Sequence, residues 1–355
     1  MQIFDVFGNI PKKLLLMQSD FTGLNFSMSG FTHSLISLFL ALLLVLIYYL
    51  IGKKVRLLLK TNDFKVFNYF IEISLGYIFV NSGLAILGMF SLLYPTVLWI
   101  YIVVVLLIAF YPYRIVPWAL KVKIKGSKWV LFGVLLFILI AFLRLIPPET
   151  GEDAIGYHTS DSRLFLKNHT TMLLPKAPPY VLPAPHLGEM SYVIFEFVGY
   201  RDASRYLHFI FYVLVISLIF IIQPYGALFL VTAPVVIQIS SKANVDFQWI
   251  LCWITSIFII TNINKNKNKI ESSMLSGILF GGVLATKLWA IAFYPLFVIY
   301  LLIFKKRPGR SKLINISIFS LGVLIVSVIW FWRSYMITGS PIYPAFASIE
   351  RLETI

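Results

Sequence analysis

Acidic residues and histidines gather in one short segment of a chain that is otherwise strongly apolar. Residues 149–169, ETGEDAIGYHTSDSRLFLKNH, hold four acids, two histidines and two basic residues. A carboxylate such as Asp153 can act as a general base toward a hydroxyl group. The competing interpretation is a solvated loop acid or a helix cap. Further candidates for substrate binding are Glu152, His158, His186 and Glu189.

The histidines do not form a recognisable metal motif. His158, His169 and His186 are separated by 11 and 17 residues, and no compact zinc-binding motif has these spacings. A hydrogen-bonding role for His158 beside the acids is favoured, and we expect no metal. The single cysteine, Cys252, excludes a disulfide. No Walker, GxSxG, CxxC or Rossmann motif occurs, so catalysis driven by ATP or NAD is unsupported and no cofactor is expected.

A second set of charged residues lies at the ends of apolar runs. Asp246, in SSKANVDFQW, begins such a run, where an ionisable side chain usually faces a cavity or a partner. We expect it to bind substrate, and the alternative is a first-turn acid favoured by the helix dipole. Basic residues in such places suit a phosphate group, although snorkelling to the membrane interface is the alternative for each. The candidates for binding a carrier phosphate are Lys242, Lys287, Arg205 and Arg333.

Membrane-spanning helices are the elements that must position these residues. Of the 355 residues 59% are hydrophobic and only 13% are charged, and a helix needs about 20 mostly apolar residues to span a bilayer. This composition predicts an all-α integral membrane protein with about ten transmembrane helices. The apolar runs are 34–51, 70–93, 95–111, 129–146, 206–222, 225–240, 246–262, 273–287, 288–304 and 313–332.

The basic residues predict how these helices are oriented. The net charge is +15, and lysine and arginine cluster in four short connections, after residues 52, 113, 264 and 304. The positive-inside rule places such connections in the cytoplasm. Alternation of the spans then puts the long polar segment 147–205 on the outer, non-cytoplasmic face. The connection near 241–245 and the residues from 333 onward lie on the same face.

The outer segment is amphipathic rather than continuously apolar. One short helix would be capped by Asp161 or Ser162, and a second would start near Gly188. Both would lie along the membrane interface. Between them, the sequence PKAPPYVLPAPH predicts a stiff loop, because its prolines deny backbone donors to a long helix or a central strand.

Five features in this order resemble the GT-C superfamily of multi-spanning glycosyltransferases, in its bacterial protein-mannosyltransferase-like branch. They are GEDAIGYHTSDSRLFLKNH, LPAPHLGEMSYVIFEFVGYRDASRYLHF, SSKANVDF, GGVLATKLWA and WFWRSYMITGSPIYP. The resemblance covers about residues 129–346. It implies a GT-C-like membrane module at 129–355 with an outer catalytic loop at 147–205, preceded by an N-terminal membrane segment of about three helices at 1–128. Relatives generally continue with more spans, so we expect a short form or a C-terminally truncated one.

The resemblance also implies an activity. Members of the superfamily transfer a sugar from a polyprenyl-phosphate donor to a lipid, glycan or protein acceptor on the non-cytoplasmic side. By position, Asp153 resembles their catalytic base, and Asp246 resembles an acid that holds donor or acceptor. Lys287 and Arg333 resemble basic residues near the carrier phosphate. The implied reaction is an inverting hexosyl transfer in which Asp153 deprotonates the acceptor hydroxyl.

Other functions stay open as alternatives. A transporter or flippase of lipid-linked sugars should show repeated halves, which the sequence lacks. An O-antigen polymerase or ligase tends to carry its large outer loop late in the chain, and a noncatalytic scaffold gives no reason for clustered acids and histidines. We expect an integral protein of the bacterial plasma (inner) membrane, active in glycan biosynthesis of the cell envelope. Its partners would be the donor, the acceptor and membrane lipid, without nucleic acid.

Overall fold

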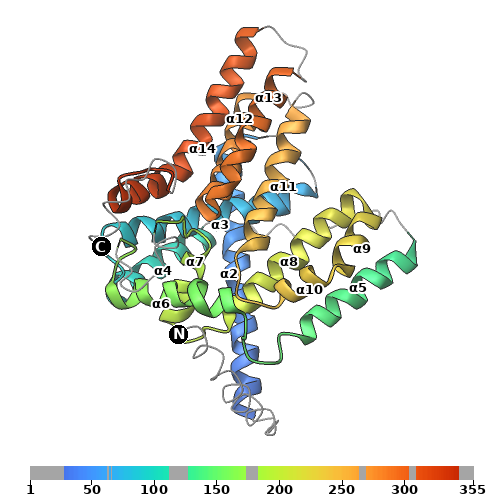
Figure 1. The fold of residues 1–355 in the computed structure, drawn as a ribbon, viewed down its shortest axis with the longest axis vertical. Helices are drawn as coiled ribbons and strands as arrows, with labels where there is room; N and C mark the ends of the chain where they lie inside the picture. The colour runs from blue at the N-terminus through green and yellow to red at the C-terminus, as the bar shows by residue number, and fades with distance from the viewer. Residues whose placement is uncertain are drawn as a thin grey trace, which may run out of the picture.

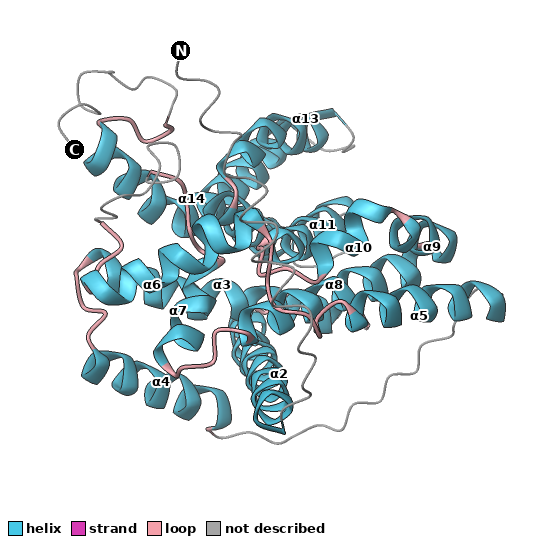
Figure 2. Ribbon diagram, turned by 60° about the horizontal axis from the view of Figure 1, so that its bottom comes forward, coloured by secondary structure: helices cyan, strands magenta, loops and turns pink. Residues whose placement is uncertain are grey.

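The computed structural model describes residues 28–61, 64, 66–111, 127–172, 183–263, 269–303 and 309–343. Within these ranges the protein is built from helices and contains no β-strand, as Figures 1 and 2 show. The all-α fold class is therefore confirmed for the described part of the chain. The elements are α2 (Met28–Leu58), α3 (Phe67–Met89), α4 (Pro95–Phe110), α5 (Lys128–Leu143), the π-helical turn η2 (Ala154–His158), α6 (Thr159–Asn168), α7 (Glu189–Phe197), α8 (Ala203–Ile222), α9 (Pro224–Thr232), α10 (Pro234–Ser240), α11 (Asp246–Asn262), α12 (Lys269–Thr286), the 3-10 helix η4 (Leu288–Phe293), α13 (Tyr294–Ile303) and α14 (Gly309–Thr338).

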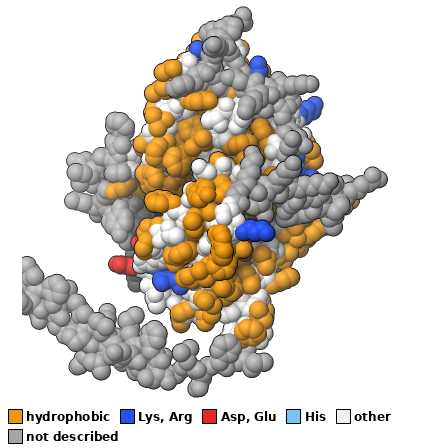
Figure 3. All heavy atoms as spheres, turned by 90° about the vertical axis from the view of Figure 1, so that its right-hand side faces the viewer, with side chains coloured by type: hydrophobic (Ala, Val, Ile, Leu, Met, Phe, Trp, Pro, Cys, Tyr) orange, Lys and Arg blue, Asp and Glu red, His pale blue; other side chains and the backbone are white. Residues whose placement is uncertain are grey.

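Four helices are long and apolar enough to cross a membrane. They are Gly30–Leu58 within α2, Phe67–Met89 (α3), Ala203–Ile222 (α8) and Ser311–Thr338 within α14. Every apolar run of the sequence contains a helix, but α4, α5 and the segment from η4 through α13 are shorter. Figure 3 shows a face on which apolar side chains predominate. A membrane protein is thus supported, whereas ten crossings stay a prediction.

The apolar run at 225–240 forms two short helices instead of one span. α9 ends at Thr232, Ala233 has an extended backbone with ψ 120°, and α10 starts at Pro234. Proline lacks an amide hydrogen and pushes the preceding residue out of the helical conformation. Pro234 therefore breaks the helix that hydropathy alone predicts.

The first basic cluster lies inside a helix rather than in a connection. Lys53, Lys54 and Arg56 belong to α2, which continues to Leu58. Arg56 is buried, and its Nε donates a hydrogen bond to Glu72 Oε1 on α3 at 2.8 Å. Most of the other basic connections lie outside the described residues.

The outer segment forms the two short helices that the sequence predicts. α7 begins at Glu189, directly after Gly188. α6, however, continues from η2 and begins at Thr159, so Asp161 lies in its first turn and caps nothing. The proposed cap at Asp161 or Ser162 is therefore wrong. The proline-rich loop lies mostly outside the described residues.

Several helix ends meet around α6 and α7 (Figures 1 and 2). Arg205, at the start of α8, donates from Nη2 to the carbonyl of Arg144 after α5 at 3.3 Å and from Nε to that of Ser241 after α10 at 3.2 Å. The amide of Leu187 donates to the carbonyl of Ala285 near the end of α12 at 3.0 Å. The ends of α5, α10 and α12 are thus joined to the outer segment by hydrogen bonds.

The N-terminal helices α2 and α3 support this centre. The Tyr48 hydroxyl lies 2.9 Å from Ser191 Oγ on α7, and Asn81 Nδ2 donates to the same oxygen at 2.8 Å. The hydroxyls of Tyr77 on α3 and Thr286 at the end of α12 are 3.1 Å apart. Because these contacts cross residue 128, the N-terminal helices pack as part of the same structure. The domain division at that residue stays a prediction.

α12 and α14 approach so closely that a side chain would separate them. A Cβ atom at Gly277 would lie 2.1 Å from the carbonyl oxygen of Phe319 on α14. Small residues allow such close approach between helices in membranes. We expect Gly277→Ala to cost about 1–3 kcal/mol of stability through overpacking, measured as a lower Tm of the purified protein in detergent.

Gly226→Ala is the matched control for this prediction. A Cβ at Gly226 would meet only ordinary contacts at 3.4 Å or more, and it lies in helix α9. Alanine is favoured over glycine in a helix by about 1 kcal/mol, so Tm should hold or rise. Equal effects of the two substitutions would contradict the close packing of α12 on α14.

Candidate functional site

A cavity of about 670 Å³ opens where the outer segment meets the ends of α12 and α14. Its polar side chains come from η2, from the turn before α7, from α7 itself and from the end of α12. Five of the residues predicted from the sequence line it together: Asp153, His158, His186, Glu189 and Lys287. Glu152, also predicted to bind substrate, is exposed and does not line the cavity.

Asp153 stands at the entrance to the π-helical turn. Its backbone is helical, its side chain is exposed, and it precedes Ala154, the first residue of η2. π-Helical turns are rare and often mark functional sites. Tyr157, in the same turn, also lines the cavity. Burial, followed by the nearby negative charge of Glu189, raises the pKa of Tyr157 above its usual range, so its hydroxyl remains a hydrogen-bond donor.

Behind Asp153 lies a buried group of two histidines and two acids. His158 Nδ1 is 2.6 Å from Glu189 Oε1, and both side chains are only 2–3% exposed. His186 Nδ1 lies 3.8 Å from the same Glu189 oxygen and 3.7 Å from Asp161 Oδ2. Asp161 was missed as a site residue, although it follows His158 by three positions and so shares its face of the helix.

The two buried acids differ in their affinity for protons. Burial alone raises the pKa of Glu189, but the hydrogen bond from His158 and the close approach of His186 outweigh it and hold the pKa below its usual range. Burial raises the pKa of Asp161 to about 6, and the nearby His186 offsets this only in part. Glu189 is therefore a permanent carboxylate, whereas Asp161 takes up a proton in mildly acidic solution.

Lys287 and Asp246 form a pair of opposite charge beside the cavity. Lys287 follows α12 directly, and Asp246 is the first residue of α11. Lys287 Nζ lies 3.9 Å from Asp246 Oδ1, and Trp249 Nε1 donates to the same oxygen at 3.4 Å. Lys287 lines the cavity and Asp246 does not. Asp246 thus has the first-turn position of the alternative interpretation, and its role in substrate binding stays a prediction.

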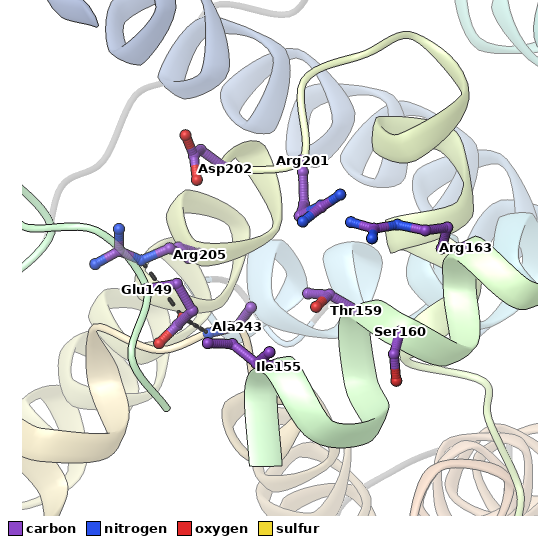
Figure 4. A pocket seen from close by; sticks show the side chains of 9 residues that line it. All are labelled: Glu149, Ile155, Thr159, Ser160, Arg163, Arg201, Asp202, Arg205 and Ala243. Atoms are coloured by element: carbon purple, nitrogen blue, oxygen red, sulfur yellow. Dashed lines mark hydrogen bonds and ion pairs between the residues drawn. The ribbon is translucent and has the colours of Figure 1, made fainter. Parts of the chain in front are cut away.

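Arg205 lies at a different cavity. A space of about 290 Å³ has Arg205 and Glu149 among its lining residues, with Arg163 and Arg201 on the opposite side (Figure 4). The Arg205 guanidinium is 3.5 Å from Glu149 Oε2 and also donates to the backbone carbonyl of Pro147 at 2.8 Å. This group holds the chain between α5 and η2 in place.

Arg333 and Lys242 also lie outside the main cavity. Arg333 is fully buried and donates to the carbonyls of Thr171 at 2.7 Å and Ala184 at 3.0 Å. Lys242 lies in the turn between α10 and α11 and lines neither cavity. Of the four cations predicted to bind a carrier phosphate, only Lys287 faces the main cavity.

The described residues contain no group of three or more His, Cys, Asp or Glu side chains with the geometry of a metal site. The buried histidines and acids are engaged with one another instead. Their chemistry is that of hydrogen bonding and charge pairing.

The raised pKa of Asp161 predicts a pH dependence of stability. Because the folded protein binds this proton more tightly than the unfolded chain, stability falls as the pH rises from about 4 to about 6, by at most about 3 kcal/mol. Asp161→Asn should flatten this dependence in thermal denaturation between pH 4.5 and 7. Asp202→Asn, at a half-exposed acid outside this buried group, is the control. An unchanged slope in Asp161→Asn would refute the assignment.

Comparison with known proteins gives one match. Residues 205–332 match the family model of dolichyl-phosphate-mannose-protein mannosyltransferases, while no curated protein and no solved structure matches the chain. The matched segment, just over a third of the chain, runs from α8 into α14 and contains Asp246 and Lys287. It supports a membrane glycosyltransferase of the mannosyltransferase type. Over residues 205–332 the predicted resemblance to the GT-C glycosyltransferases is thereby confirmed.

Proposed function

We propose that the protein transfers a sugar from a polyprenyl-phosphate donor to a lipid, glycan or protein acceptor on the non-cytoplasmic face of the membrane. The observation that carries this proposal is the meeting of Asp153 and Lys287 in one cavity. A carboxylate that can accept a proton and a cation that can bind phosphate are the two groups that such a transfer requires. They come from segments more than one hundred residues apart.

The distribution of lining residues supports an amphipathic donor. The polar side chains come from η2 and α7, whereas η4 contributes Leu288, Trp289 and Ile291, and Ile342 lies near the end of the described chain. Trp289 is half exposed. A sugar phosphate would lie against the polar elements and the polyprenyl chain against the apolar ones. Lys287, at the junction of α12 and η4, would bind the phosphate between them.

The proposed reaction assigns one role to each of these two residues, Asp153 and Lys287. Asp153 removes the proton from the acceptor hydroxyl as its oxygen forms a bond to the anomeric carbon. The bond from that carbon to the phosphate oxygen breaks, and its electron pair leaves with the carrier phosphate. Lys287 stabilises the charge on that phosphate. Attack opposite to the leaving group inverts the anomeric configuration.

The first test measures release of free carrier phosphate. The full chain in nanodiscs is incubated with a panel of radiolabelled polyprenyl-phosphate sugars that includes mannose, together with lipid, glycan and peptide acceptors that carry free hydroxyl groups. Asp153→Asn should lower turnover by about 10²–10⁴-fold, as expected for loss of a general base, while membrane insertion is retained. Asp202→Asn, the same change at a half-exposed acid outside the main cavity, should keep wild-type activity.

Two outcomes would contradict this proposal. Full activity of Asp153→Asn would remove Asp153 from the role of base. Binding of a donor without release, unchanged by Asp153→Asn, would favour a transporter of lipid-linked sugars.

The second test concerns the phosphate. Lys287→Met should lower kcat/KM for the donor by about 10- to 100-fold, the cost of losing one hydrogen bond to a charged group. This substitution also leaves Asp246 without its cation. The double variant Lys287→Met/Asp246→Asn removes that stranded charge and is the control. Recovery of activity in the double variant would show that Lys287 acts only by neutralising Asp246.

A further inference from the structure

The proposed reaction leaves two buried residues of the cavity without a role. Glu189 and His158 both line the cavity and are almost wholly shielded from solvent. A carboxylate is costly to bury unless it is well paired. Their contact of 2.6 Å is a short, charge-assisted hydrogen bond.

This contact fixes which nitrogen of His158 carries hydrogen. The Glu189 carboxylate can only accept a hydrogen bond, because its pKa lies below its usual range and it stays ionised. The proton of the contact therefore belongs to His158 Nδ1. In a neutral imidazole the other nitrogen, Nε2, then carries a lone pair and accepts a hydrogen bond.

The imidazole ring is held in this orientation from several sides. The Tyr157 ring packs against it, with 4.0 Å between ring centroids. The Ser162 hydroxyl lies 2.9 Å from the backbone carbonyl of His158 and 3.2 Å from that of Glu189, and so links η2 to α7. Among the described residues no hydrogen bond reaches His158 Nε2. An acceptor nitrogen is thus kept in a cavity that, under the proposed function, binds a molecule rich in hydroxyl groups.

We propose that His158 is a specificity-determining residue whose Nε2 accepts a hydrogen bond from one hydroxyl of the transferred sugar, and that Glu189 is a positioning residue that sets this tautomer. The sugar contact rests on the proposed function. The hydrogen on Nδ1 does not, because it follows from the Glu189 contact. A site built to bind a hydroxyl strongly rejects an analogue that lacks it, because the buried acceptor is then left unpaired.

The tautomer is tested without any substrate. The chain has five histidines, so the ¹⁵N resonances of histidine-labelled protein are few, and the His158→Asn variant identifies those of His158 by difference. We expect a protonated Nδ1 and an unprotonated Nε2 near neutral pH. Glu189→Ala should release the ring to a mixture of tautomers. A wild-type His158 that carries hydrogen on Nε2 would overturn the proposal, even if Glu189→Ala does not fold.

The sugar contact is tested with donors in which one hydroxyl at a time is replaced by hydrogen. One of these deoxy donors should lose about 10- to 100-fold in kcat/KM with the wild-type protein. His158→Asn can still donate an amide hydrogen to Glu189 but has no group at the Nε2 position. It should be impaired with the parent donor and show no further loss with that deoxy donor, because the two changes remove the same contact.

His169→Asn is the matched control for the kinetic experiment. His169 lies outside the cavity, stacks on Tyr94, and has a left-handed backbone with φ 57° that asparagine tolerates. This variant should discriminate between the donors as the wild-type protein does. If the deoxy donor lowers kcat/KM of His158→Asn as much as it lowers that of the wild-type protein, the sugar contact is refuted.

The outcome also separates this proposal from the proposed function. If no donor of the panel is turned over, the transferase assignment fails, and the ¹⁵N resonance of His158 Nε2 is followed while the same donors are added. A shift with a parent donor that is lost with one deoxy donor would still support the contact. No shift with any donor would refute it.

Discussion

The negative charge of Glu189 in the interior is the constraint on which the centre of this structure depends. It stands in the first turn of α7, where the helix dipole favours an acid. The dipole alone does not compensate for burial, so His158 and His186 approach the same oxygen. These contacts tie η2 and the chain before α7 to α7. Burial of one charge therefore determines how the outer segment folds back on itself.

Hydrogen bonds from α2 and α3 hold the opposite side of α7. Both helices precede residue 129, where the resemblance to the family begins. Tyr48 and Asn81 both reach Ser191, two residues beyond Glu189. Tyr77 reaches Thr286, which borders the cavity next to Lys287. An apolar interior makes each of these hydrogen bonds costly to lose. The N-terminal helices thus position the site residues although they contribute no side chain to its polar lining.

The sequence predicted the helices well because long apolar runs permit little else in a membrane. It failed at 225–240, where hydropathy is continuous but Pro234 ends one helix and begins another. Burial of Arg56 against Glu72 could not be predicted either, because charge patterning alone does not show that α2 continues past the basic cluster.

The candidate site was predicted in part. Asp153, His158, His186 and Glu189 were expected together because they share a polar segment, and Lys287 because it ends an apolar run. Arg205 and Arg333 were expected to face a phosphate, but both donate to backbone carbonyls. The type of a residue and its position at the end of an apolar run do not show which backbone carbonyls a turn leaves without a hydrogen-bond donor. Only the fold shows where a guanidinium is needed to satisfy them.

The two carboxylates of the cavity have environments that favour different roles. Asp153 is exposed at the start of η2, where under the proposed function it would meet the acceptor hydroxyl, whereas Glu189 is fixed by its histidines. The segment that matches the family model contains Lys287 but neither of these acids. Lys287 therefore comes from the matched segment, and the acids and His158 of the cavity come from the chain before it. Under the proposed function, the outer segment would then select the sugar and the acceptor. The family match begins only at the last residue of this segment, so the buried contacts of Glu189 are the main structural guide to that selection.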